Sequence, residues 1–510
     1  MSEQSEQEPK TSAKQEHEPP RGAETTSTWT GGATPIDYTA SAKWLVLRKK
    51  EKPSAEIFSV SYVADRRDHD RPVMFVFNGG PGAASAFLHL GVAGPQRVVF
   101  PPDGRLPEMP PRLVQNESSW LAFADLVFVD PVGTGFSRVI ETETQIQPAE
   151  AAKNGKPDDA PDPKEYFGQN RDLESLCEFM GRWLSANGRW GSPVLIAGES
   201  YGGYRVGRLA RMLQETAGIG LNGAILISPA LEVTGLSSSD YDVLVWVDTL
   251  PTMAAAAVHH GRSRAFAPGT SLEEVLDGAE EFATGEYASF LTRGASMQPA
   301  ERTPILERLS DLTGLPVELV TRADGRISIR TFSRELLRDE RKVVGLYDCT
   351  ITATDPFPDR DPFEGPDPTL AGIGPAYTMA INRQLRSEIG VETDREYMLL
   401  SYEVNEAWKE DTQRHFFAPP PGATDDLRYG MALNPRLKAF ITHGRYDLVT
   451  PYYTSDRLRN LMRLDPEMAG RLTVRHYGGG HMFYAWEESR RAFSSAVAEF
   501  VADATATRRE

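Results

Sequence analysis

Cysteine is almost absent from this sequence. The 510 residues contain two cysteines, Cys177 and Cys349, which lie in different regions and show no metal-ligand spacing. This usage predicts neither a disulfide framework nor a cysteine-based metal site, and it favours a reducing compartment. We therefore expect a protein that works without a metal or another cofactor.

Long apolar segments are missing as well. No stretch reaches the roughly 18 consecutive apolar residues of a membrane span. Residues 1–28 are mostly Glu, Gln, Ser, Thr and Pro, without the apolar centre of a secretory signal. Such a segment buries too little surface to offset the entropy lost on ordering, so we expect residues 1–28 to be a disordered tail. These absences predict a cytoplasmic protein with no membrane partner.

Positive charge is in deficit. Lys and Arg total 55 against 72 Asp and Glu, which gives a net charge of −17. This balance argues against nucleic acid as a partner, because a polyanion would be repelled. The sequence leaves the oligomeric state open, and a homodimer is compatible with it.

Short apolar runs that end in glycine or polar residues recur over residues 29–230. Residues 73–77, 126–129 and 224–227 are continuous apolar runs of the kind found in strands buried on both faces. Amphipathic patterns over residues 170–185 and 204–214 predict helices between such strands. The alternation indicates an α/β fold with a central, mostly parallel sheet.

The alternation stops after residue 230 and resumes near residue 402. Residues 231–401 read as mostly helical, with a loop rich in Pro and Asp over residues 352–369. We therefore predict a core made of residues 29–230 and 402–510, with a large, mainly helical cap inserted at 231–401. Within the core, the acidic stretch over residues 141–164 is interpreted as a surface excursion. The cap helices are expected at 241–260, 271–293, 303–312 and 334–343.

A nucleophile is predicted at Ser200. The apolar run that begins at Pro193 ends in Gly198-Glu199-Ser200-Tyr201-Gly202, and a helical pattern follows. A strand, a sharp G-x-S-x-G turn and a helix together form a nucleophile elbow. Its glycines are needed because the turn is tight and its neighbours pack closely.

Serine needs a base, and the base needs a carboxylate that orients it. Asp447 follows the strand predicted to end at Gly444, and His481 follows the strand predicted to end at Tyr477. The order Ser, Asp, His, with each residue on a loop after a strand, is that of an α/β-hydrolase. We expect Ser200, Asp447 and His481 to form a catalytic triad.

Four blocks in this order resemble the serine carboxypeptidase family of the α/β-hydrolases. They are the stretches that begin at Asn78 (NGGPGAAS), Asp130 (DPVGTGFS), Gly198 (GESYGG) and Gly480 (GHM). The resemblance implies an α/β-hydrolase fold and cleavage of the C-terminal residue of peptides.

The resemblance also implies roles for further residues. The backbone N–H groups of Gly80 and Tyr201 would form the oxyanion hole, where each donor contributes about 3 kcal/mol in the transition state. Asn78, Gly79 and Glu199 would bind the free carboxylate of the substrate.

One position departs from the family. Many members carry a second carboxylate just before a Gly-Pro, where this sequence has Val92. Without that partner, we expect the pKa of Glu199 to lie nearer that of an ordinary glutamate.

Two alternative functions stay open: an esterase, amidase or acyltransferase on the same scaffold, acting on a small ester or amide, and a non-catalytic binding protein.

Overall fold

The structure, a computed structural model of the chain, describes residues 17–65, 70–140, 163–232, 239–410 and 422–506. The expected surface excursion at 141–164 lies almost wholly outside the described residues. Within the described residues, no helix combines the length and apolar character needed to cross a membrane.

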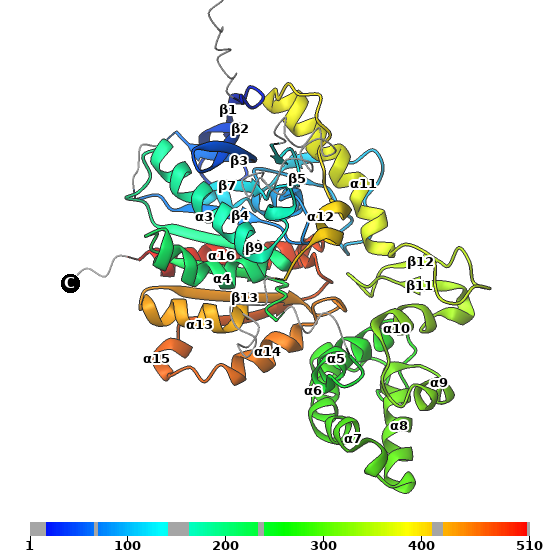
Figure 1. Cartoon of the computed structure of the whole chain (residues 1–510). Coiled ribbons are helices and arrows are strands. Elements are labelled where there is room, and N and C mark those ends of the chain that lie inside the picture. Colours follow the sequence, from blue (N-terminus) through cyan, green and yellow to red (C-terminus); the bar gives the residue numbers. More distant parts are fainter. Residues whose placement is uncertain (1–16, 66–69, 141–162, 233–238, 411–421, 507–510) are drawn as a thin grey trace, which may run out of the picture.

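A central sheet organises the molecule (Figure 1). In spatial order its strands are β1 (Ala23–Trp29), β2 (Ile36–Lys49), β3 (Lys52–Ala64), β7 (Asp125–Asp130), β4 (Val73–Phe77), β9 (Val194–Glu199), β10 (Gly223–Ile227), β13 (Lys438–Gly444) and β14 (Leu472–Tyr477), with β8 (Arg138–Val139) beside β3. Pairing is antiparallel from β1 to β7 and parallel from β7 to β14. The predicted mostly parallel sheet is confirmed.

The central strands are apolar throughout because both of their faces are covered. Along β4, Val73, Phe75 and Phe77 belong to one apolar cluster, whereas Met74 and Val76 belong to another. The first cluster includes side chains of α3, α4 and α13, and the second includes side chains of α11 and α16. The alternation of side chains along a strand thus divides one run between two helical layers.

The helices connect the strands and form the inserted region. Their bounds are α1 (Ala86–Leu88), α3 (Gln169–Ala186), α4 (Tyr201–Thr216), α5 (Val243–His259), α6 (Leu272–Phe282), α7 (Ala288–Arg293), α8 (Pro299–Thr313), α9 (Val317–Arg322), α10 (Ile329–Glu335), α11 (Pro368–Arg383), α12 (Tyr402–Ala407), α13 (Ala423–Leu433), α14 (Tyr452–Leu461), α15 (Pro466–Ala469) and α16 (Glu487–Thr505). Short π-helical or 3₁₀ turns occur at η1 (His89–Ala93), η2 (Trp120–Ala122), η4 (Pro163–Tyr166), η6 (Ala283–Tyr287), η7 (Gly294–Ser296), η8 (Arg338–Glu340), η9 (Gln384–Ile389) and η10 (Phe483–Ala485). Two small hairpins lie off the main sheet: β5 (Gln96–Val98) with β6 (Leu113–Gln115), and β11 (Lys342–Val344) with β12 (Thr352–Thr354).

The prediction of a disordered tail over residues 1–28 extends too far along the chain. Residues 1–16 lie outside the described residues, but Ala23–Trp29 forms β1 and pairs with Ile36–Ala42 of β2 over its whole length. Backbone hydrogen bonds to a neighbouring strand order this segment, and its composition alone gives no sign of them.

The inserted region is mainly helical, with two local corrections. Helices α5 to α10 gather to one side of the sheet, around an apolar cluster of their own (Figure 1). The helix expected over residues 334–343 ends at Glu335, and strand β11 begins at Lys342. The loop expected over residues 352–369 contains β12 and the first two residues of α11. Helix α11 packs into the core cluster that covers the sheet, so the end of the predicted cap is continuous with the core.

Candidate active site

Ser200 lies at the turn between β9 and α4, as the sequence predicts. Its backbone has φ 62° and ψ −123°, a left-handed conformation that a non-glycine residue adopts only under strain. The turn is tight: a Cβ added at Gly198 would lie 2.2 Å from the carbonyl oxygen of Gly202. The Ser200 N–H donates to the Ile227 carbonyl oxygen at 2.9 Å, which fixes the turn against β10. This geometry is that of a nucleophile elbow.

Asp447 and His481 meet at the carboxyl ends of β13 and β14. The distance between His481 Nδ1 and Asp447 Oδ2 is 2.6 Å, and both side chains are buried. The other carboxylate oxygen of Asp447 accepts from the backbone N–H groups of Val449 and Thr450, at 2.8 and 3.1 Å. Thr450 Oγ1 donates to Asp447 Oδ2 at 2.6 Å. The carboxylate is therefore fixed in orientation, as a residue that orients a catalytic histidine must be.

The charges around His481 favour its protonated form. Burial alone would lower the pKa of His481, but the carboxylates of Asp447 and Glu199 raise it above its ordinary value. His481 Nε2 lies 4.0 Å from Glu199 Oε1, so the imidazole faces the turn that carries Ser200. Within the described residues, no hydrogen bond joins Ser200 Oγ to His481. Such bonds often form only when substrate is bound.

The two predicted oxyanion donors lie on adjoining backbone segments. A Cβ added at Gly79 would lie 2.4 Å from the backbone nitrogen of Tyr201, so the loop after β4 packs directly on the start of α4. Gly80 has φ 99°, which turns the chain at this contact. In the described part of the chain, neither the Gly80 nor the Tyr201 N–H donates a hydrogen bond to a loop or side-chain acceptor.

Glu199 is buried beside the triad. Its Oε2 accepts from Tyr484 Oη at 2.6 Å and from Asn78 Nδ2 at 3.2 Å. Burial raises the pKa of Glu199 to about 7, although His481, Tyr484 and Asn78 each favour the charged form. We expected the pKa of Glu199 to lie nearer that of an ordinary glutamate because Val92 replaces the second acid; burial instead raises this pKa, with a smaller contribution from Asp447.

Residues 40–253 match the family model described as serine carboxypeptidase. They include three of the four blocks described above. Across these residues, the chain is similar to the serine carboxypeptidase family.

Two relatives and one solved structure illustrate the family likeness. Serine carboxypeptidase-like 5 from Arabidopsis thaliana is 28% identical over 191 residues, which cover 36% of this chain and 38% of the relative. The pheromone-processing carboxypeptidase KEX1 from Saccharomyces cerevisiae is 33% identical over 135 residues, which cover 26% of this chain and 16% of the relative. The matches thus span well under two thirds of these relatives. The crystal structure of KEX1(Δ)p, a prohormone-processing carboxypeptidase from S. cerevisiae, aligns over 92% of both chains with a TM-score of 0.51 and 15% identity. This likeness supports the α/β-hydrolase fold.

The surroundings of Val92 differ from the family pattern at the position of the second acid. Val92 is fully buried, and two tyrosines lie next to its neighbour Gly91. A Cβ added at Gly91 would lie 2.4 Å from Cε2 of Tyr484 and 2.7 Å from the hydroxyl of Tyr377. Tyr377 is fully buried, and its hydroxyl has no hydrogen-bond partner within the described residues. Two phenols thus lie beside the segment in which many family members carry the second carboxylate, and one of them, Tyr484, donates to Glu199.

Sequence reasoning missed the residues that orient the predicted ones. Thr450 follows Asp447 by three residues, a spacing typical of a local turn, and could have been found. No local pattern marks Tyr484 and Tyr377. Tyr484 contacts Glu199, which is distant in sequence, and Tyr377 reaches the site from the inserted region.

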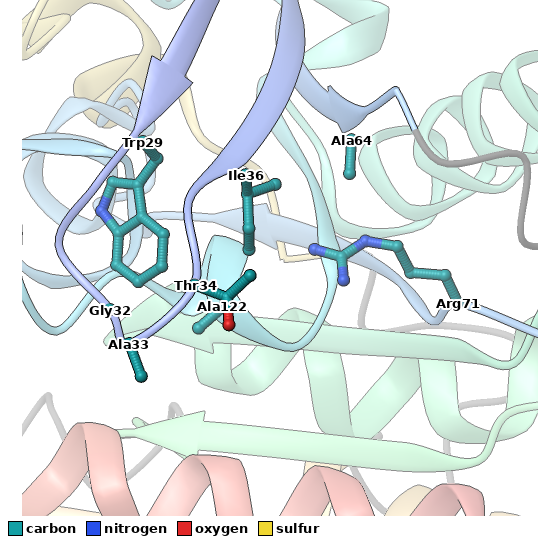
Figure 2. Close-up of a pocket in the computed structure, with 8 residues that line it drawn as sticks. All are labelled: Trp29, Gly32, Ala33, Thr34, Ile36, Ala64, Arg71 and Ala122. Carbon is teal, nitrogen blue, oxygen red and sulfur yellow. The ribbon is translucent and has the colours of Figure 1, made fainter.

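Two cavities lie elsewhere. One of about 250 Å³ opens between the β1–β2 turn and Arg71 (Figure 2). Arg71 Nε donates to Asp125 Oδ1 at 2.7 Å, so its guanidinium already has a carboxylate partner. The other cavity, of about 350 Å³, lies in the inserted region near Arg330 and Asp367. None of the predicted site residues lines either cavity.

Proposed function

We propose that this protein is a serine carboxypeptidase that releases C-terminal residues from peptides through an acyl-enzyme on Ser200. The observation that carries the proposal is the buried His481–Asp447 pair at 2.6 Å, which faces the strained turn of Ser200 and Glu199. In this proposal the Glu199 carboxyl group binds the free carboxylate of the substrate, a role that a general hydrolase does not need.

The reaction follows from the roles of these groups. His481 Nε2 takes the proton of Ser200 Oγ as the oxygen attacks the scissile carbonyl carbon. Asp447 keeps Nδ1 protonated and stabilises the imidazolium that forms. The N–H groups of Gly80 and Tyr201 receive the oxyanion. His481 then gives the proton to the leaving amine as the C–N bond breaks, and water hydrolyses the acyl-enzyme in the same way.

Glu199 supplies the preference for a free C-terminus. Two carboxylates within hydrogen-bonding distance favour retention of one proton. With its pKa raised to about 7 by burial, Glu199 holds that proton at neutral and acidic pH and donates it to the substrate carboxylate. The amide of Asn78, which is already 3.2 Å from Glu199, supplies a second donor.

A fluorophosphonate probe and paired substrates test the proposal. Ser200→Ala is expected to lose labelling and to reduce turnover by about 10⁶-fold, whereas Ser175→Ala, in helix α3, keeps both. Wild type is expected to cleave N-blocked dipeptides with a free C-terminus in preference to their amidated counterparts. Turnover of Ser200→Ala above a few per cent of the wild-type rate would contradict the nucleophile assignment.

An esterase or amidase is the second candidate, and the replacement of the second acid by Val92 favours it. Faster cleavage of the amidated than of the free-acid dipeptides would establish it.

The described structure also supports the proposed cytoplasmic location, since Cys177 and Cys349 are both free and buried. Cell fractionation would test this location.

A further inference from the structure

A short segment of the inserted region, residues 346–349, contacts the loops of both Asp447 and His481. The Leu448 N–H donates to the Leu346 carbonyl oxygen, and the Cys349 N–H donates to the Tyr446 carbonyl oxygen, both at 3.0 Å. These two bonds flank Asp447 on either side. The segment therefore continues the backbone structure of the catalytic loops, although about 100 residues of sequence separate them.

The same segment binds the histidine loop. The His481 N–H donates to the Tyr347 carbonyl oxygen at 2.5 Å. The rings of Tyr347 and His481 meet edge to face, with centroids 5.2 Å apart. The Gly480 N–H donates to Asp348 Oδ2 at 3.0 Å. The successive N–H groups of Gly480 and His481 thus donate to Asp348 and Tyr347, respectively.

The carboxylate of Asp348 is buried, and both of its oxygens accept hydrogen bonds. Oδ2 also accepts from Trp486 Nε1 at 3.3 Å, while Oδ1 accepts from the Thr350 N–H and hydroxyl at 3.0 and 2.6 Å. Burial raises the pKa of Asp348 to about 6, against the effect of these donors. The side chain therefore connects its own turn, the loop of His481 and the residue that precedes α16.

Glycine at position 480 makes this contact possible. A Cβ added there would lie 2.1 Å from the Tyr347 carbonyl oxygen and 2.4 Å from Cβ of Asp348. The chain has three successive glycines before His481, Gly478 to Gly480, and such a segment has many accessible backbone conformations. An external anchor is needed to select one of them.

We propose that Asp348 is a positioning residue for His481, acting through the backbone of Gly480. The proposal rests on the proposed function, because it assigns Asp348 a role in the turnover that His481 supports. Asp447 fixes Nδ1 of the imidazole, whereas Asp348 fixes the peptide from which the side chain extends. Both constraints are needed, since a displacement of about 1 Å at a catalytic group can cost about 100-fold in rate.

Variants of Asp348 and Thr350 separate positioning from loop stability. Asp348→Ala removes the acceptor for Gly480 and is expected to lower kcat by about 10- to 100-fold with KM nearly unchanged. Asp348→Asn keeps one oxygen that can accept from Gly480 and should recover most of kcat. Thr350→Ala removes a donor to Asp348 within the same turn but leaves the Gly480 contact, so its kcat should stay near the wild-type value. The rate of fluorophosphonate labelling should follow kcat in all three.

Several outcomes would overturn the proposal. Equal loss of kcat in Asp348→Ala and Thr350→Ala would show that the turn is merely structural, and so would unchanged labelling in Asp348→Ala. If Asp348→Ala does not fold, Asp348→Glu replaces it: this variant keeps the charge but displaces the oxygens, and wild-type kcat in it would exclude positioning. Wild-type enzyme that neither labels nor cleaves peptides would overturn the proposed function itself, and this inference with it.

Discussion

Glu199 shows how a single buried residue can set the pH range of a site. Its carboxyl group accepts from Tyr484 and Asn78, and its second oxygen lies 4.0 Å from His481 Nε2. Burial nevertheless outweighs these partners and raises its pKa to about 7. The proton on Glu199 is therefore present below neutral pH and is lost as the pH rises through 7.

Activity on free-acid peptides should follow that proton. We expect kcat/KM for a peptide with a free C-terminus to fall as the pH rises above about 7, because an ionised Glu199 repels the substrate carboxylate. The matched amide substrate should show no such fall. Glu199→Gln keeps a donor without the charge, so it should remove the alkaline decline. The measurement is kcat/KM from about pH 5 to 9 on both substrates.

Glu280 provides a matched control for this experiment. It lies in α6, accepts from Tyr452 Oη at 2.6 Å, and burial raises its pKa as well. Glu280→Gln should keep the wild-type profile. Identical profiles for Glu199→Gln and wild type on both substrates would mean that Glu199 is structural and does not bind the substrate carboxylate.

At the scale of elements, the sequence predicted the buried strands best. The apolar run over residues 73–77 coincides with β4, and the pattern over 472–477 coincides with β14. Strand β4 is fully buried, so its apolar composition reports its environment directly, whereas β14 lies at the end of the sheet and alternates between buried and exposed residues. Strand β1 escaped prediction because it is ordered by backbone pairing with β2, which polar residues make as well as apolar ones.

The residues of the site also fall into two groups, those that the sequence predicts and those that it does not. The order of Ser200, Asp447 and His481, each after a strand, predicted the triad, and the structure brings Asp447 and His481 together. Tyr484 and Asp348 could not be predicted, because their partners, Glu199 and Gly480, lie more than 100 residues away in sequence. Contacts between such distant segments depend on the packing of the whole fold and leave no local pattern.

Arg205 connects three elements beneath the site. In α4 it is almost fully buried, and its guanidinium donates to both oxygens of Asp172 in α3, at 2.7 and 3.2 Å. It also donates to the Asn78 carbonyl oxygen at 2.8 Å, in the loop that follows β4. One side chain thus fixes the two helices relative to the loop that would supply the Gly80 oxyanion donor.

Arg205→Met should therefore be strongly destabilising. The change leaves Asp172 buried without its partner, which costs about 3–5 kcal/mol. Arg211→Met is the matched control in the same helix, because Arg211 is much less buried than Arg205 and pairs with Glu215 and Asp426. Its loss should cost about 1 kcal/mol or less. Urea denaturation followed by circular dichroism compares the two, and equal midpoints would contradict the role given to Arg205.

At the scale of the whole molecule, the inserted helices α5 to α10 lie beside the sheet but are not independent of it (Figure 1). Their apolar cluster includes Tyr446, Leu448 and Tyr452, which lie on and just after the Asp447 loop. An ion pair strengthens the connection: Arg457 of α14 donates to both oxygens of Asp248 in α5, at 2.7 and 2.6 Å. The orientation of the inserted helices thus depends on the loop and helix that follow β13.

Breaking this ion pair should loosen α5 while leaving the triad intact. Arg457→Met leaves the buried carboxylate of Asp248 without its partner, which should lower the local opening free energy of α5 by about 1–3 kcal/mol. Hydrogen–deuterium exchange read by mass spectrometry should show faster exchange in α5, with fluorophosphonate labelling unchanged. Arg264→Met is the control, because the pair of Arg264 and Asp311 is about half exposed and contributes little. If α5 exchanged no faster in Arg457→Met than in Arg264→Met, the apolar contacts with Tyr446, Leu448 and Tyr452 would be sufficient to fix the inserted helices on the core.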